Sequence, residues 1–276
     1  MAAWGWDVPA RVRWIEQCLA LGVTSFDHAD IYGGYSVEAL FGEALAASPG
    51  LREGLQIVTK CGIKLVSPAR PAHRLKSYDS SRAHITRSVE ASLRALRTDR
   101  IDVLLLHRPD ALMDPDEVAE TFAALRSAGK VLHFGVSNHA PSQLAPLHRR
   151  LPLVTQQIEF SPLQMQALAD GTLDQCLDLG LRPMIWSPLA GGSLFTDDSE
   201  RAQRVRAVLT GLAQAHQVSL ATVAYAWILR HPARPLPITG SSRIEAIAEA
   251  VAALSLRLDA EDWYQVWRAS AGHDVP

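Results

Sequence analysis

The sequence predicts an α/β protein built as a (β/α)8 barrel. Short apolar runs alternate with longer amphipathic segments along the whole chain. Several runs, most clearly LLLH at 104–107, are apolar at consecutive positions, which is typical of parallel strands covered on both faces. The first strand is followed by IYGGYS and not by the GxGxxG fingerprint of an open dinucleotide-binding sheet, so the closed barrel is favoured. With 276 residues, the chain fits one domain over 1–276.

The strands are expected in seven apolar runs. Each is short, and each is bounded by turn residues or by a helical pattern. They lie at 23–29, 55–61, 101–107, 131–137, 153–160, 181–187 and 235–240.

The intervening segments carry the start and stop signals of helices. In DPDEVAETFAALRSAG, Asp114 can cap free N–H groups, Pro115 suits the first turn, and Gly129 can end the helix. Similar patterns cover about 84–97 and 219–230, and Ser242 with Glu245 has capping-box spacing. The buried stripe of the first example consists of Val118, Phe122 and Leu125.

The N-terminal segment departs from a complete barrel. The first helix begins near Asp7 and Pro9, and MAAWGWDVP is too short and too polar to form a whole buried strand ahead of it. We therefore expect this chain to lack the N-terminal hairpin and the first barrel strand. A start assigned too far downstream is the favoured explanation, and filling of the gap by residues 1–8 or by a partner chain is the alternative.

Composition limits the possible partners and location. The formal net charge is −2, which gives no electrostatic reason to expect nucleic acid or a membrane surface as a partner. The three cysteines, Cys18, Cys61 and Cys176, form no paired framework and indicate a reducing compartment. No apolar segment reaches the roughly 18 residues that a membrane span needs. A cytoplasmic location is expected, and the oligomeric state is not predicted.

Four chemically related side chains follow the first three predicted strands. Asp27 ends the first strand, Lys60 the second and His107 the third, and Tyr32 lies in the loop after the first. In a barrel the carboxyl ends of the strands meet at one face, so these groups are expected in one pocket. An ammonium next to a phenol stabilises the phenolate, a carboxylate holds the ammonium, and an imidazole can bind the oxygen that receives a proton. The set suits reduction of a carbonyl, with Tyr32 as the proton donor.

An ordered series of motifs resembles the aldo-keto reductase superfamily. FDHADIYGG, VTKCG, LLLHRPD, FGVSN, QQIEFSPL and WSPLAGG occur in this order, and HADIYGGY together with the ending HDVP is similar to the bacterial YdhF-like oxidoreductase branch. The resemblance implies a barrel reductase that uses NADPH and acts on a small-molecule carbonyl substrate. It also implies that the catalytic residues are Asp27, Tyr32, Lys60 and His107.

The resemblance further implies the residues that contact the cofactor. Ser137, Asn138 and Gln157 correspond to groups that bind the nicotinamide carboxamide, and Trp186 corresponds to the ring that stacks on the nicotinamide. Arg243 is the candidate partner of a 2′-phosphate, whereas Ala246 replaces a second basic residue, so NADH is not excluded. The remaining implied contacts are Ser187, Leu189, Gly191, Gly192, Thr239, Gly240 and Ser241.

Other functions compete with this interpretation. A non-catalytic nicotinamide-nucleotide-sensing subunit with the same fold is the main alternative. A Schiff-base lyase with Lys60 as nucleophile is disfavoured, because Asp27 would keep the ammonium charged. A metal-dependent hydrolase lacks HxH or HExxH spacing, and no metal site is predicted. The substrate itself is not predicted, although residues 62–80 are expected near the mouth of the barrel.

Overall fold

The computed structural model describes residues 4–275. The chain divides into two compact units, 1–156 and 157–276, and the boundary falls within strand β7, Thr155–Glu159. Each unit is described by itself below. The organisation as a single barrel domain over 1–276 stays a prediction.

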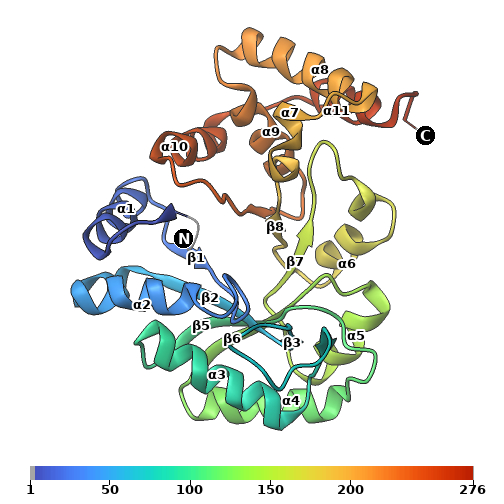
Figure 1. The fold of residues 1–276 in the computed structure, drawn as a ribbon. Coiled ribbons are helices and arrows are strands. Elements are labelled where there is room, and N and C mark those ends of the chain that lie inside the picture. Colours follow the sequence, from blue (N-terminus) through green and yellow to red (C-terminus); the bar gives the residue numbers. More distant parts are fainter. Residues whose placement is uncertain (1–3, 276) are drawn as a thin grey trace. The chain divides into compact units, whose positions relative to one another are not determined.

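Residues 1–156 contain four strands that pair in parallel, in the order β1-β2-β5-β6 (Figure 1). Helices α1 to α5 alternate with these strands, and a short antiparallel pair, β3 and β4, follows β2. The strands are β1 Ser25–Asp27, β2 Gln56–Cys61, β3 Ile63–Lys64, β4 Ser77–Tyr78, β5 Ile101–Leu106 and β6 Val131–Ser137. The helices are α1 Val8–Ala20, α2 Val37–Ala47, α3 Arg82–Leu96, α4 Pro115–Ser127 and α5 Pro141–Arg150, with the 3-10 helix η2 Pro49–Gly54.

Residues 157–276 pair the strands β7, β8 and β9 in parallel. Most of this unit is helical (Figure 1). The strands after β7 are β8 Met184–Trp186 and β9 Leu236–Pro237. The helices are α6 Thr172–Asp178, α7 Ser193–Thr196, α8 Glu200–His216, α9 Leu220–Leu229, α10 Ile244–Ala252 and α11 Ala260–Ala271, with the 3-10 helices η3 Gln166–Leu168, η4 Ala190–Gly192 and η5 Ala253–Ser255.

All seven predicted strand runs contain a strand of the structure. The alternation of strand and helix is that of a (β/α)8 barrel, while the absence of the N-terminal hairpin and of the first barrel strand from this chain stays a prediction. Trp4 and Trp6 contact the ring of Trp14 on α1, and residues 4–7 contain no strand. Residues 1–3, which belong to the segment considered as a filler of the missing strand, lie outside the described residues.

The local signals of the helices are largely confirmed. Asp7 caps α1 by accepting from the N–H of Ala10, and Asp114 caps α4 by accepting from the N–H of Asp116. The capping box expected at Ser242 is wrong. The cap of α10 is Arg243, and the hydroxyl of Ser241 accepts from its N–H, because the chain before the helix forms its own turn.

Each unit has an apolar core of its own. Between α4 and β6, the rings of Phe122 and Phe134 stack with centroids 4.1 Å apart. In residues 157–276, Trp227 of α9 and Trp263 of α11 stack 5.2 Å apart, and each indole N–H donates to the main-chain oxygen of the other residue. Burying aromatic rings of this size contributes strongly to stability.

Candidate active site

The four predicted catalytic side chains come together in residues 1–156. Asp27 ends β1 and pairs in register with Val58 of β2, and Lys60 lies two residues further along β2. His107 follows β5, where its N–H donates to the oxygen of Cys61 at 2.8 Å. Three neighbouring parallel strands therefore carry these groups to the same end of the sheet.

The loop that carries Tyr32 is held on β2 by its own backbone. The N–H of His28 donates to the oxygen of Val58 at 2.8 Å, and the N–H of Asp30 donates to the oxygen of Lys60 at 3.1 Å. A turn follows, closed by the N–H of Tyr32 on the oxygen of Ala29. The backbone hydrogen bonds between β1 and β2 thus continue past the end of β1, and they hold the phenol of Tyr32 close to Lys60.

The ammonium of Lys60 has three acceptors. It donates to Asp27 Oδ2 at 2.6 Å, to the main-chain oxygen of His28 at 2.8 Å and to Tyr32 Oη at 3.0 Å. The side chain of Lys60 is fully buried, so these contacts offset the desolvation of its charge. An ammonium has only three N–H groups. All of them are used, and the hydroxyl hydrogen of Tyr32 is free to point to another acceptor.

His107 is buried next to the phenol. Its ring lies edge-on to that of Tyr32, with centroids 5.8 Å apart. Burial, and then the positive charges of Lys60, Arg108 and Lys76, lowers the pKa of His107 from 6.5 to about 3. The imidazole is therefore neutral near pH 7 and can donate one hydrogen bond to an oxygen atom.

A buried polar network supports β2 below these groups. Glu38 of α2 accepts from Thr59 Oγ1 at 2.6 Å and from Ser92 Oγ of α3 at 2.9 Å. Burial raises the pKa of Glu38, although both hydrogen bonds act in the opposite direction. Since Thr59 precedes Lys60 on β2, this network fixes the strand from the helix side. Sequence reasoning missed it because Glu38 and Ser92 are 54 residues apart.

Two predicted cofactor residues lie at the end of β6. Ser137 is buried, and its Oγ accepts from Asn138 Nδ2 at 2.7 Å. Asn138 has a left-handed backbone, with φ 58°. Such a conformation is uncommon outside glycine and indicates a position that the surrounding structure holds in place.

The loop after β8 contains several left-handed residues. Trp186 ends β8 with a half-buried indole. In Ser187–Gly192, four residues have positive φ, from 50° at Ser187 to 98° at Gly192. No atom lies within 4 Å of a Cβ built on Gly191 or on Gly192, so the backbone there is open to a ligand. The N–H of Gly192 donates to the oxygen of Leu189 and is therefore already used within the turn.

The remaining cofactor candidates also lie in residues 157–276. Gln157 is buried in β7, opposite Met184 of β8. Arg243 is exposed at the start of α10, a helix of nine residues. The segment leading to it contains Thr239, Gly240 and Ser241. The side chain of Thr239 is hydrogen-bonded to that of Tyr225.

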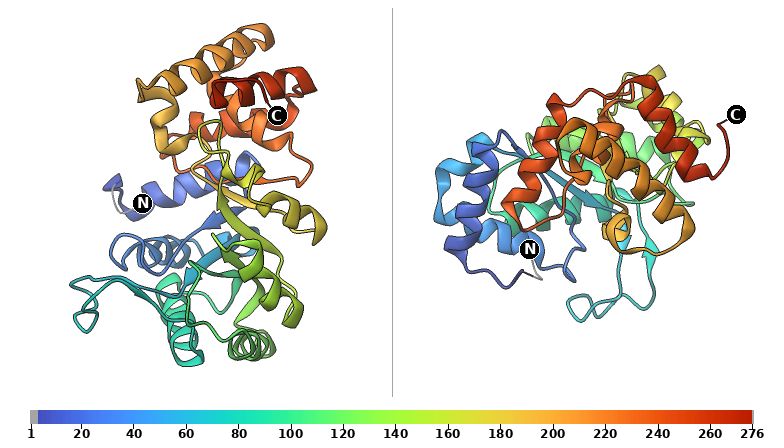
Figure 2. Two further views of the ribbon diagram at one scale, coloured as in Figure 1. Left: turned by 90° about the vertical axis from the view of Figure 1, so that its right-hand side faces the viewer. Right: turned by 90° about the horizontal axis from the view of Figure 1, so that it is seen from above.

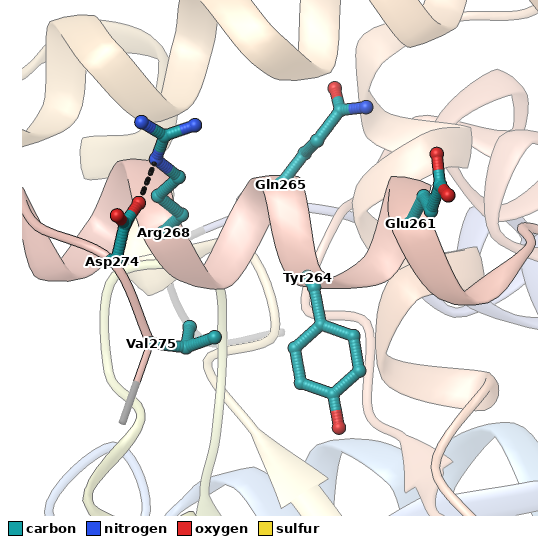
Figure 3. A pocket seen from close by; sticks show the side chains of 6 residues that line it. All are labelled: Glu261, Tyr264, Gln265, Arg268, Asp274 and Val275. Atoms are coloured by element: carbon teal, nitrogen blue, oxygen red, sulfur yellow. Dashed lines mark ion pairs between the residues drawn. The ribbon is translucent and has the colours of Figure 1, made fainter.

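A pocket on the surface of α11 contains none of the predicted site residues (Figure 3). Its lining includes Tyr264 and the ion pair between Arg268 and Asp274, with Nε and Oδ1 2.8 Å apart.

Among residues 4–275, no helix is long and apolar enough to cross a membrane. The three cysteines are all free and buried.

Comparison with known proteins identifies the family of the chain. The profile of the Aldo/keto reductase family matches residues 4–270. The chain is 50% identical to the uncharacterized oxidoreductase YcsN of Bacillus subtilis, over 99% of this chain and 92% of that protein. It is equally 50% identical to the oxidoreductase YdhF of Escherichia coli, over 98% and 91%. A 6-dehydroglucose reductase of Agrobacterium fabrum is 43% identical, over 97% and 90%.

Solved structures show the same fold. An aldo/keto reductase from Klebsiella pneumoniae, in complex with NADP and acetate, superposes with a TM-score of 0.77 at 26% identity, covering 95% of this chain and 85% of that one. The glycerol dehydrogenase of Gluconobacter oxydans gives a TM-score of 0.85 at 24% identity, covering 98% and 88%.

The family match and the fold shared with solved aldo/keto reductases define an oxidoreductase that acts on carbonyl groups. The chain belongs to the Aldo/keto reductase family, and its similarity to YdhF confirms the branch expected from the motifs.

Proposed function

We propose that this chain reduces an aldehyde or ketone to an alcohol with NADPH, and that Tyr32 is the general acid. The observation that carries the proposal is the contact of 3.0 Å between Lys60 Nζ and Tyr32 Oη, in a buried site where Asp27 holds the ammonium. Bound NADPH would supply the hydride for the carbonyl carbon. All other steps below use side chains of residues 1–156.

The proton transfer follows from the hydrogen bonds of Tyr32. Its oxygen accepts from Lys60, so its O–H is available to the carbonyl oxygen of the substrate. As negative charge develops on that oxygen, the phenol donates its proton, and the adjacent ammonium stabilises the phenolate that remains. The neutral imidazole of His107 donates a second hydrogen bond to the same oxygen and orients it.

The residues proposed for the cofactor fit such a ligand. Gly191 and Gly192 leave open space along the backbone, and the exposed guanidinium of Arg243 can bind a 2′-phosphate through two hydrogen bonds. NADP in the Klebsiella pneumoniae relative supports NADPH as the cofactor. Ala246 offers no second cation, so use of NADH at lower affinity is compatible with the proposal.

The proposal includes a small-molecule substrate and a cytoplasmic location. Three buried, unpaired thiols fit a reducing compartment. The name of the Agrobacterium fabrum relative makes an oxidised sugar one reasonable member of a substrate panel.

The experiment replaces Tyr32 by Phe. Loss of the general acid should lower kcat at least about 10²-fold, because the alkoxide would have no proton donor. Binding of NADPH, measured by quenching of protein fluorescence, should stay within about twofold. Turnover at the normal rate would reject Tyr32 as the acid, whereas NADPH binding without turnover of any carbonyl by the unmodified protein would favour the nucleotide-sensing alternative.

A further inference from the structure

The segment 62–80 between β2 and α3 carries an excess of positive charge next to the candidate active site. It contains four basic residues and one acidic residue, in a chain with 27 basic and 29 acidic residues. Figure 2 shows the part between β3 and β4 as an extended loop that projects from the strands of residues 1–156. The loop connects directly to β2, which carries Lys60.

This loop is attached to the turn that carries Tyr32. Tyr35 Oη accepts from the N–H of Leu65 at 2.9 Å, and the guanidinium of Arg70 lies 4.4 Å from the centre of the Tyr35 ring. His73 Nδ1 contacts the oxygen of Leu65 at 3.0 Å. Tyr32 lies only three residues before Tyr35. These contacts therefore hold the loop in a defined position relative to the phenol of Tyr32.

The other end of the loop is attached next to His107. The N–H and the hydroxyl of Ser80 both donate to Asp110 Oδ2, at 3.0 and 2.7 Å. Asp110 lies three residues after His107, and Arg108 lies between them. These contacts bring β4 and the residue before it, Lys76, beside the segment that carries the imidazole.

Among the cations of the loop, Lys76 is the one available to a ligand near His107. Lys64 pairs with Asp79 at 3.9 Å, and Arg70 lies over Tyr35. The ammonium of Lys76 is exposed and forms no hydrogen bond or ion pair within residues 4–275. Its charge, like that of Arg108, contributes to the lowered pKa of His107. Arg74, two residues earlier, is equally exposed on the same loop.

We propose that the substrate carries an anionic group, a carboxylate or a phosphate, which binds at Lys76 while its carbonyl oxygen lies between Tyr32 and His107. This inference rests on the proposed function, and names the substrate class of the same site. An exposed cation near the reacting group selects anionic substrates by direct attraction and by steering.

The test compares two aldehydes that differ in charge. The protein is assayed with 4-carboxybenzaldehyde and with its neutral methyl ester, and 4-formylphenyl phosphate distinguishes a preference for phosphate from one for carboxylate. Lys76→Gln should raise KM for the carboxylate roughly fivefold, with KM for the ester within twofold. Arg74→Gln is the matched control, since it removes the same charge from the same exposed loop, and should leave both KM values within twofold.

A binding measurement separates this inference from the proposed function. In titration calorimetry with NADP+ present, Lys76→Gln should weaken benzoate roughly fivefold and leave neutral benzamide unchanged. Equal effects of the two loop variants, or equal effects on the charged and neutral ligands, would overturn the anion site. Retained benzoate binding without reduction of either aldehyde would instead overturn the proposed reaction.

Discussion

The two units of the molecule hold their candidate functional groups in opposite ways. In residues 1–156 the catalytic candidates are largely buried and bind one another, and Lys60 alone has three hydrogen-bond acceptors. In residues 157–276 many candidates lie on exposed or half-exposed loops, where Gly191 and Gly192 leave open space and Arg243 is exposed. If the proposed roles are correct, the groups for proton transfer are preorganised before a ligand binds, whereas many of the groups proposed for the nucleotide are accessible to it.

The largest expected effect tests the preorganised region. Lys60→Met removes the charge that stabilises a phenolate at Tyr32, and should lower kcat at least about 10²-fold, measured as NADPH absorbance with a reactive aldehyde. Lys130→Met is the control, because Lys130 forms an ion pair with Glu90 and is not one of the four candidate catalytic residues. Normal turnover in the first variant would mean that the buried contact to Tyr32 is structural only.

Close packing in the first unit can be tested with one added methyl group. A Cβ on Gly42 of α2 would lie 2.1 Å from the oxygen of Ala95 and 2.8 Å from the carbonyl carbon of Leu96. Because backbone atoms cannot move away cheaply, Gly42→Ala should reduce the free energy of unfolding by about 3 kcal/mol or more in urea titrations.

The same change in the second unit should have the opposite sign. Gly211 lies inside α8 with no atom within 4 Å of a built Cβ, so Gly211→Ala should stabilise the protein by about 0.5–1 kcal/mol. Destabilisation by both substitutions would contradict the contrast in packing.

The accessible groups proposed to bind the nucleotide are tested at Arg243. Arg243→Ala should raise KM for NADPH about tenfold and KM for NADH less than twofold, since only NADPH offers a 2′-phosphate to the guanidinium. Arg257→Ala, at another exposed arginine of residues 157–276, is the matched control. A similar loss for both cofactors would assign Arg243 to a different part of the nucleotide.

A pH-dependent effect on stability is expected from a buried histidine of the first unit. Burial, and then the charge of Lys60, lowers the pKa of His28 from 6.5 to about 3. The unfolded chain binds a proton that the folded chain excludes, so stability present above pH 6.5 is lost as pH falls towards 3. As pH falls from 6 to 4, this histidine should lower the free energy of unfolding by roughly 1.4 kcal/mol per pH unit.

The measurement compares urea unfolding of the unmodified protein with that of His28→Asn. The difference between the two curves isolates His28, because burial raises the pKa of Asp30 to about 8 and this opposing contribution is present in both proteins. His133→Asn, at an exposed position on β6, serves as the control. Identical pH slopes in all three proteins would show that His28 is protonated in the folded state.

The sequence by itself determined the order of strands and helices and the identity of the four clustered groups. Both depend on local patterns, since a strand is read from consecutive apolar residues, and Asp27, Lys60 and His107 were found by their position at strand ends. Helix caps such as Asp7 and Asp114 are local for the same reason.

Only the tertiary structure decided which distant groups meet. The ladder between β3 and β4, the contact of Tyr35 with Leu65 and the network of Glu38 join residues up to 54 positions apart. No short-range pattern encodes such pairs, because each partner alone looks like an ordinary polar residue. The physical reason is that hydrogen bonds between distant segments form only once the sheet and its helices have brought them within about 3 Å of each other.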